Sequence, residues 1–155
     1  MELRILGAHN MESRDTRFAA HLVDGILALD AGGLTRSLSF EEQEQIRAIV
    51  LTHRHFDHVR DLLPFGLTMR DKGVTVDVFG IKDTLDFVTE KLMDGSLYPN
   101  FLEFPTPECP IYAFHEIEPL VEFLVLNYTV KAVPVPHAVP AVGYMVSTEI
   151  GRAHV

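Results

Sequence analysis

Four potential metal ligands lie within the six residues 53–58, directly after an apolar run. The run at 48–51, AIVL, is typical of a fully buried strand. The ligand candidates that follow it are His53, His55, Asp57 and His58. Imidazole nitrogens and carboxylate oxygens suit zinc, manganese or iron, and a buried strand gives such ligands a rigid base. The segment therefore predicts a metal site at the carboxyl end of a central strand.

The spacing of these ligands predicts two neighbouring points of convergence. His53 and His55 are two residues apart, so an extended segment directs both side chains the same way. Asp57 and His58 follow where the chain must turn, which aims them at a second point nearby. The alternative is a solvated histidine-rich loop without metal, as short motifs do occur by chance. The buried strand directly before the cluster favours the metal site.

Short apolar segments on both sides of this cluster predict strands. They are residues 2–6, 17–23, 26–30, 48–51, 74–79, 111–117, 121–126, 128–135 and 142–148. Asp24-Gly25 is typical of a hairpin turn between two of them. Strands followed by helices and by strands again favour an α/β fold, a mixed sheet sandwich with helices on its outer faces.

Helices are expected at three places. Ser39 and Glu42 form a capping-box pattern, so a short helix should begin near Phe40. Residues 61–72 can form a second helix, in which Pro64 is tolerable only near the first turn. Residues 81–93 have helical apolar spacing. With no internal repeat and no domain boundary, residues 1–155 are expected to form a single domain.

Charge and cysteine content restrict the function. The net charge of −9 argues against a broad nucleic-acid-binding surface, although a bound metal pair would add local positive charge. The single cysteine, Cys109, excludes an intramolecular disulfide and a thiolate cage, so histidines and carboxylates must hold any metal. No signal-peptide stretch and no membrane-spanning run is present in the sequence, so we expect a cytoplasmic protein without membrane contact.

Other candidate residues have mainly structural interpretations. His9 and His21 can approach the edge of the metal site but are expected to be structural, and His115 is expected to be half-buried in a strand. The segment 94–110 is rich in proline and aromatic residues, and a loop of this length is often functional. We favour a packed loop anchored by aromatic side chains over a substrate-binding one.

Three stretches of this sequence resemble the metallo-β-lactamase superfamily. Residues 53–58 match its His-x-His-x-Asp-His motif, residues 29–33 (LDAGG) resemble the strand and turn that precede this motif, and residues 135–144 (VPHAVPAVGY) resemble its third-histidine segment. The last stretch is most similar to the phosphodiesterase branch, which includes tRNase Z-type enzymes and class II cyclic-nucleotide phosphodiesterases.

The resemblance implies an αββα sandwich and a role for each matching residue. His53, His55 and His137 would bind a first metal, whereas Asp57 and His58 would bind a second. Asp57 would also take a proton from the catalytic water. Asp30 would orient a ligand histidine by accepting its second N–H. The implied cofactor is one or two zinc ions, with manganese or iron as alternatives.

Two family ligands have no counterpart here. The bridging aspartate and the last histidine of the family would follow a strand like residues 143–147, but the sequence ends at Val155, and His154 is not in place to substitute. The resemblance therefore predicts an incomplete domain that lacks its C-terminal part. Alone, it is expected to be weakly active or inactive.

The resemblance leaves three functions open. The first is hydrolysis of a phosphodiester, either a small molecule or RNA, by metal-activated water. The second is a non-catalytic metal-binding fragment, or half-domain, that pairs with a partner or with itself through an unpaired sheet edge. The third is hydrolysis of a thioester or lactam by the same kind of site.

Overall fold

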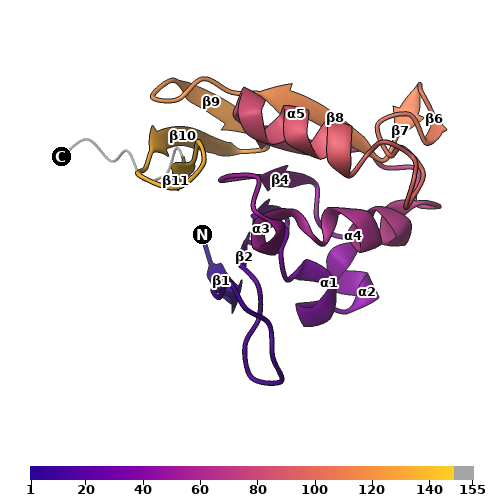
Figure 1. Ribbon diagram of the computed structural model, residues 1–155, viewed down its shortest axis with the longest axis horizontal. Helices are drawn as coiled ribbons and strands as arrows, with labels where there is room; N and C mark the ends of the chain where they lie inside the picture. The colour runs from indigo at the N-terminus through magenta and orange to yellow at the C-terminus, as the bar shows by residue number, and fades with distance from the viewer. Residues whose placement is uncertain (149–155) are drawn as a thin grey trace.

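The computed structural model describes residues 1–148, so His154 lies outside the described residues. Its strands are β1 (Leu3–Gly7), β2 (Ala20–Val23), β3 (Leu27–Leu29), β4 (Ala48–Val50), β5 (Val76–Gly80), β6 (Pro105–Thr106), β7 (Cys109–Pro110), β8 (Tyr112–Glu116), β9 (Glu122–Val125), β10 (Tyr128–Pro134) and β11 (Val142–Thr148). Its helices are α1 (Leu34–Ser37), α2 (Phe40–Gln43), α3 (Phe56–Val59), α4 (Leu62–Met69) and α5 (Lys82–Lys91). Figure 1 shows their arrangement.

The larger sheet is mixed and has the order β1-β2-β3-β4-β5-β8. Strands β1, β2 and β3 are antiparallel, whereas β3, β4, β5 and β8 run parallel to one another. The predicted turn joins β2 to β3, with positive φ angles of 47° at Asp24 and 75° at Gly25. Because β3 and β4 are parallel neighbours, the residues after each strand meet at one edge of the sheet.

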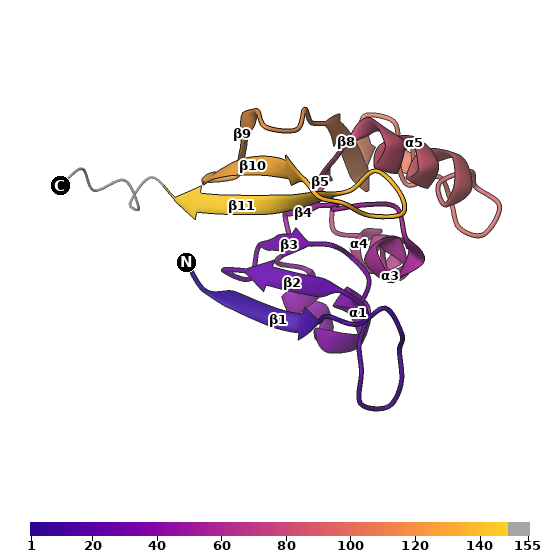
Figure 2. The ribbon, with the colours of Figure 1, turned by 60° about the vertical axis from the view of Figure 1, so that its left-hand side comes forward.

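Alternating side chains divide this sheet into two buried faces. Leu22, Ala28 and Ile49 belong to a core shared with helical residues such as Leu34 and Phe65. The intervening residues face a second sheet, of order β11-β10-β9. There the buried contacts are formed by Val23, Leu27, Ala48, Val50, Val125, Tyr128 and Val130. The result is a layer of helices, a six-stranded sheet and a three-stranded sheet (Figure 2).

Most of the predicted elements are confirmed. Ser39 caps α2 by accepting a hydrogen bond from the Glu42 backbone N–H, and the Glu42 carboxylate accepts one from the Ser39 N–H. Pro64 lies in the first turn of α4, where its missing N–H costs nothing. The two four-residue helices α1 and α3 were not predicted. Neither has a side-chain cap, so the sequence carries no local signal for them.

The segment 94–110 is a packed loop, as favoured from its aromatic content. Phe101 is fully buried beneath α4 and packs against Tyr112, with their ring centroids 6.0 Å apart. A small hairpin of β6 and β7 was not predicted here. His115 lies in β8, as expected, but the expectation that it is half-buried was wrong. Its side chain is exposed, bonded to Asp77 and stacked on Phe79.

None of the helices within residues 1–148 is long and apolar enough to span a lipid bilayer.

Candidate metal centre

The three clustered histidines, His53, His55 and His137, come from two segments of the chain. A hydrogen bond between backbone groups links these two segments. His53 and His55 lie in the segment between β4 and α3, at the carboxyl end of β4. His137 lies in the loop between β10 and β11, 82 residues from His55 in sequence. At the end of this loop the Val142 N–H donates to the Thr52 carbonyl oxygen at 3.0 Å. This bond anchors the His137 loop beside the strand end that carries the other two histidines.

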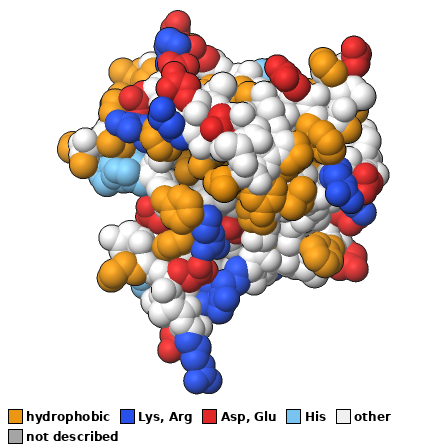
Figure 3. Space-filling view, turned by 45° about the vertical axis from the view of Figure 1, so that its right-hand side comes forward, with side chains coloured by type: hydrophobic (Ala, Val, Ile, Leu, Met, Phe, Trp, Pro, Cys, Tyr) orange, Lys and Arg blue, Asp and Glu red, His pale blue; other side chains and the backbone are white. Residues whose placement is uncertain are grey.

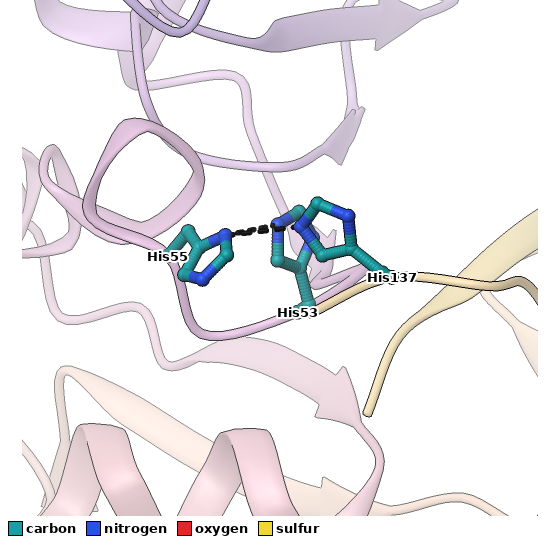
Figure 4. A group of neighbouring side chains, drawn as sticks. All are labelled: His53, His55 and His137. Atoms are coloured by element: carbon teal, nitrogen blue, oxygen red, sulfur yellow. Dashed lines mark hydrogen bonds between the residues drawn. The ribbon is translucent and has the colours of Figure 1, made fainter. Parts of the chain in front are cut away.

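The three imidazoles converge on one point (Figure 4). His55 Nδ1 lies 3.1 Å from His53 Nε2 and 3.0 Å from His137 Nε2. Three ring nitrogens, one from each histidine, all lie within 4.8 Å of one another. Two nitrogens bound to one tetrahedral zinc ion at about 2.0–2.1 Å are roughly 3.3 Å apart. The donor set and its spacing therefore fit one metal ion held by three imidazoles.

His53 is held in the neutral form that metal binding requires. Burial, followed by the nearby charges of His58 and of the other imidazoles, lowers the pKa of His53 to about 4, although Asp30 opposes the shift. The ring is therefore unprotonated near neutral pH and keeps a nitrogen lone pair available. A metal ligand must be unprotonated, so no proton has to be displaced from this imidazole when an ion binds.

Asp30 connects the ends of β3 and β4. It adopts a φ of 63°, and its carboxylate accepts hydrogen bonds from the Thr52 N–H at 2.8 Å and from His58 Nδ1 at 2.7 Å. The Thr52 hydroxyl lies 2.9 Å from Asp30 Oδ2 and 2.9 Å from His53 Nδ1. When this hydroxyl donates to the carboxylate, it accepts the His53 Nδ1–H and leaves His53 Nε2 facing the site.

Thr52 is a residue of the candidate site that the sequence reasoning missed. The Thr52 hydroxyl contacts both the Asp30 carboxylate and His53 Nδ1, so it links Asp30 to His53. Asp30 contacts His58 directly. In the sequence, Thr52 lies between the buried strand and the first histidine. A threonine at such a position occurs in many local structures, so the sequence alone does not indicate its role. Only the pairing of β3 with β4 identifies its partner.

Asp57 and His58 lie on α3, beside the three histidines. His58 Nε2 is 3.3 Å from Asp57 Oδ2, and the ring centroids of His53 and His58 are 4.0 Å apart. Burial lowers the pKa of His58, but the hydrogen bond that His58 donates to Asp30 and the charges of Asp30 and Asp57 outweigh it, so this pKa is raised. The pair therefore lies next to the three histidines, and its role as ligands of a second ion stays a prediction.

Close backbone packing holds α3 in this position. The Ala31 N–H donates to the His58 carbonyl at 2.7 Å, and the Ala19 N–H donates to the Asp57 carbonyl at 3.1 Å. At Gly32 a β-carbon would lie only 1.7 Å from the Asp57 carbonyl oxygen. The glycine that follows Asp30-Ala31 is therefore required for the loop to approach the helix that carries Asp57.

Comparison with known proteins identifies the family. Residues 22–154 match the model of the beta-lactamase superfamily domain. The chain belongs to this superfamily. Its fold is shared with the metallo-β-lactamase fold protein YhfI from Bacillus subtilis, at a TM-score of 0.73 and 15% identity. The aligned region covers 94% of this chain and 57% of YhfI. The superfamily and the fold that were predicted from the motifs are thus confirmed.

Two further similar proteins carry the names ribonuclease Z and tRNase Z. Ribonuclease Z from Pyrococcus furiosus is 28% identical over 103 residues, which are 65% of this chain and 31% of that protein. The structure of human tRNase Z, short form, aligns with a TM-score of 0.68 and 19% identity, over 96% of this chain and 66% of that one. This chain therefore spans less than two thirds of the length of each of these relatives.

Proposed function

We propose that this chain carries the metal-binding part of a hydrolase that cleaves phosphodiesters with metal-activated water. The observation that carries the proposal is the convergence of three ring nitrogens, from His53, His55 and His137, which all lie within 4.8 Å of one another. The similarity to ribonuclease Z and to tRNase Z supports a phosphodiester substrate, either RNA or a small molecule. We further propose that residues 1–155 form one domain and that the protein is cytoplasmic.

Each residue has a defined part in this chemistry. A bound zinc ion, or manganese or iron in its place, supplies Lewis acidity and lowers the pKa of a water molecule. His53, His55 and His137 would hold the ion, and Asp30 with Thr52 would keep His53 in the tautomer that this binding requires. Asp57, which lies 3.3 Å from His58 Nε2, would accept a proton from the attacking water, and Asp57 and His58 would offer ligands for a second ion.

Metal stoichiometry and activity test this proposal. We expect the purified full chain to bind at least one equivalent of zinc and to hydrolyse bis(p-nitrophenyl) phosphate slowly. Chelation should abolish the activity and added zinc should restore it, because the ion activates the water. Absence of bound metal, or hydrolysis that is insensitive to chelation, contradicts the proposal. Faster hydrolysis of a thioester or a β-lactam than of bis(p-nitrophenyl) phosphate would support the alternative function, hydrolysis of a thioester or lactam.

We also propose that the chain associates with a second copy through β11. Within residues 1–148, β11 pairs with β10 alone, so one strand edge remains available for pairing. Met145 on β11 is 64% exposed, as expected for a surface that another chain can cover. Light scattering on the eluting protein should give twice the monomer mass, and the Met145→Lys variant should shift that mass toward the monomer. A monomer at all concentrations contradicts this proposal.

A further inference from the structure

The loop that carries His137 lies at the surface of the molecule. Residues 134–138 are all exposed, and Figure 3 shows that histidine side chains reach the molecular surface. The loop joins the antiparallel strands β10 and β11, and the Val135 N–H closes its base by donating to the Ala141 carbonyl at 3.0 Å. Because exposed residues have few packing contacts, the position of His137 depends on how the β10–β11 hairpin is attached to the rest of the protein.

Two hydrogen bonds attach β11 to the chain that follows β4. The first is the bond from the Val142 N–H to the Thr52 carbonyl at 3.0 Å. In the second, the Tyr144 hydroxyl donates to the Leu51 carbonyl at 2.8 Å. The two acceptors are adjacent and directly precede His53, whereas the two donors are two residues apart on a strand, which is about 6.6–6.8 Å. One bond alone would let the hairpin pivot, but two bonds at this spacing also fix its direction.

The bond from Tyr144 satisfies a buried backbone carbonyl. The regular pairing of β4 with β3 and β5 ends at Val50, and the next residue, Leu51, is fully buried. A buried carbonyl oxygen without a partner is costly, so this oxygen needs a donor inside the protein. Burial, with a smaller contribution from Asp30, raises the pKa of Tyr144 far above its usual value, so the hydroxyl keeps the proton that it donates. The Tyr144 ring packs separately on the core between the two sheets.

We propose that Tyr144 is a positioning residue for the metal ligand His137. This inference rests on the proposed function, because it requires that His137 share an ion with the two histidines that follow β4. The hydroxyl bond to Leu51 sets the direction of the hairpin and thereby holds His137 Nε2 at 3.0 Å from His55 Nδ1. Without this bond the hairpin stays attached through Val142 but can pivot, so fewer of its orientations bring His137 to the ion. Tyr144 thus acts through the third ligand and not on the ion itself.

The variant Tyr144→Phe, which removes the hydroxyl and keeps the ring, tests this role in the full chain. We expect its zinc affinity to fall about 10-fold, at the lower end of the range for residues that orient metal ligands. Tyr112→Phe is the matched control, because the buried Tyr112 hydroxyl also donates to a backbone carbonyl, that of Leu62 at 2.6 Å, within the core on the helical side. It should lose similar stability and keep its zinc affinity. Titration against a competing chelator, below both melting temperatures, measures the affinities. Unchanged affinity in Tyr144→Phe, or an equal loss in Tyr112→Phe, overturns the proposal.

A second control separates the bond at Leu51 from the attachment of the whole three-stranded sheet. The Tyr128 hydroxyl donates to the Asp24 carboxylate at 2.5 Å, at the end of β10 opposite the His137 loop. Tyr128→Phe should therefore loosen this sheet far from the loop and leave the zinc affinity unchanged. A loss of zinc affinity as large as that in Tyr144→Phe would mean that any loosening of the sheet weakens the site, which contradicts a specific role for Tyr144.

Combination with His137→Ala distinguishes positioning from a general loss of stability. If Tyr144 acts through His137, Tyr144→Phe should weaken zinc binding by less than about 2-fold once His137 is already alanine. A purely structural role would reduce the affinity by the same factor in both backgrounds, and that result overturns the inference. The same titrations separate this inference from the proposed function. An unmodified chain that binds no zinc contradicts the proposed function, whereas zinc binding with equal losses in both backgrounds contradicts the positioning role alone.

Discussion

The variant His137→Ala should lose zinc affinity by more than about 100-fold and lose metal-dependent hydrolysis with it. Removal of a residue that merely orients a ligand costs about 10–100-fold in metal affinity, so removal of a ligand should cost at least that upper value. His137 Nε2 lies 3.0 Å from His55 Nδ1, and without it two imidazoles of the group remain. Zinc titration against a competing chelator measures the loss directly.

His137 is better suited to this test than the other two histidines. It is exposed in a loop, whereas His53 is buried, so truncation of its side chain should leave the fold intact. His115→Ala is the matched control, because His115 is also exposed and its partner is Asp77, outside the site. It should bind zinc as the unmodified chain does. Equal zinc affinity in His137→Ala and His115→Ala would show that the three rings do not share an ion.

The local parts of this site could be predicted from the sequence because their signals are local. The buried strand before His53 and the spacing to His55 depend on neighbouring residues alone. The same holds for the turn at Asp24-Gly25, which needs residues that tolerate positive φ. The approach of His137 was predicted only through a family resemblance. In the structure, a backbone hydrogen bond between β11 and Thr52 holds the His137 loop in place. Local sequence patterns do not predict this hydrogen bond.

The remaining features depend on strand pairing. The part played by Thr52 follows from the parallel register of β3 and β4, which sets Asp30 beside it. Likewise, His9 and His21 were expected to be structural, because their position beside α3 appears only when β1, β2 and the helix pack together. Residue types and spacing indicated which side chains can bind a metal. They did not indicate which polar groups orient these side chains.

The largest effect on stability is expected for Gly32→Ala, which should destabilise the chain by about 3 kcal/mol. The new β-carbon would lie 1.7 Å from the Asp57 carbonyl oxygen and 2.8 Å from the Ala19 carbonyl oxygen. These neighbours are backbone atoms, so they cannot move aside as the end of a flexible side chain would. Separation of the loop from α3 would break the bond from the Ala19 N–H to Asp57 and the bond from the Gly32 N–H to Ala19.

The melting temperature of Gly32→Ala should accordingly fall by about 6–12 °C, at about 2–4 °C per kcal/mol for a domain of this size. Gly143→Ala is the matched control. Its β-carbon would meet Val135 at 3.7 Å, an ordinary contact, and alanine is no worse than glycine within a strand. Because Gly32 packs on the helix that carries Asp57 and His58, its variant should also bind zinc more weakly than Gly143→Ala does. A melting temperature within about 2 °C of that of the unmodified chain would mean that the loop accommodates the added methyl group without loss of stability. In that case the close approach of this loop to α3 is not what positions Asp57 and His58 beside the three histidines.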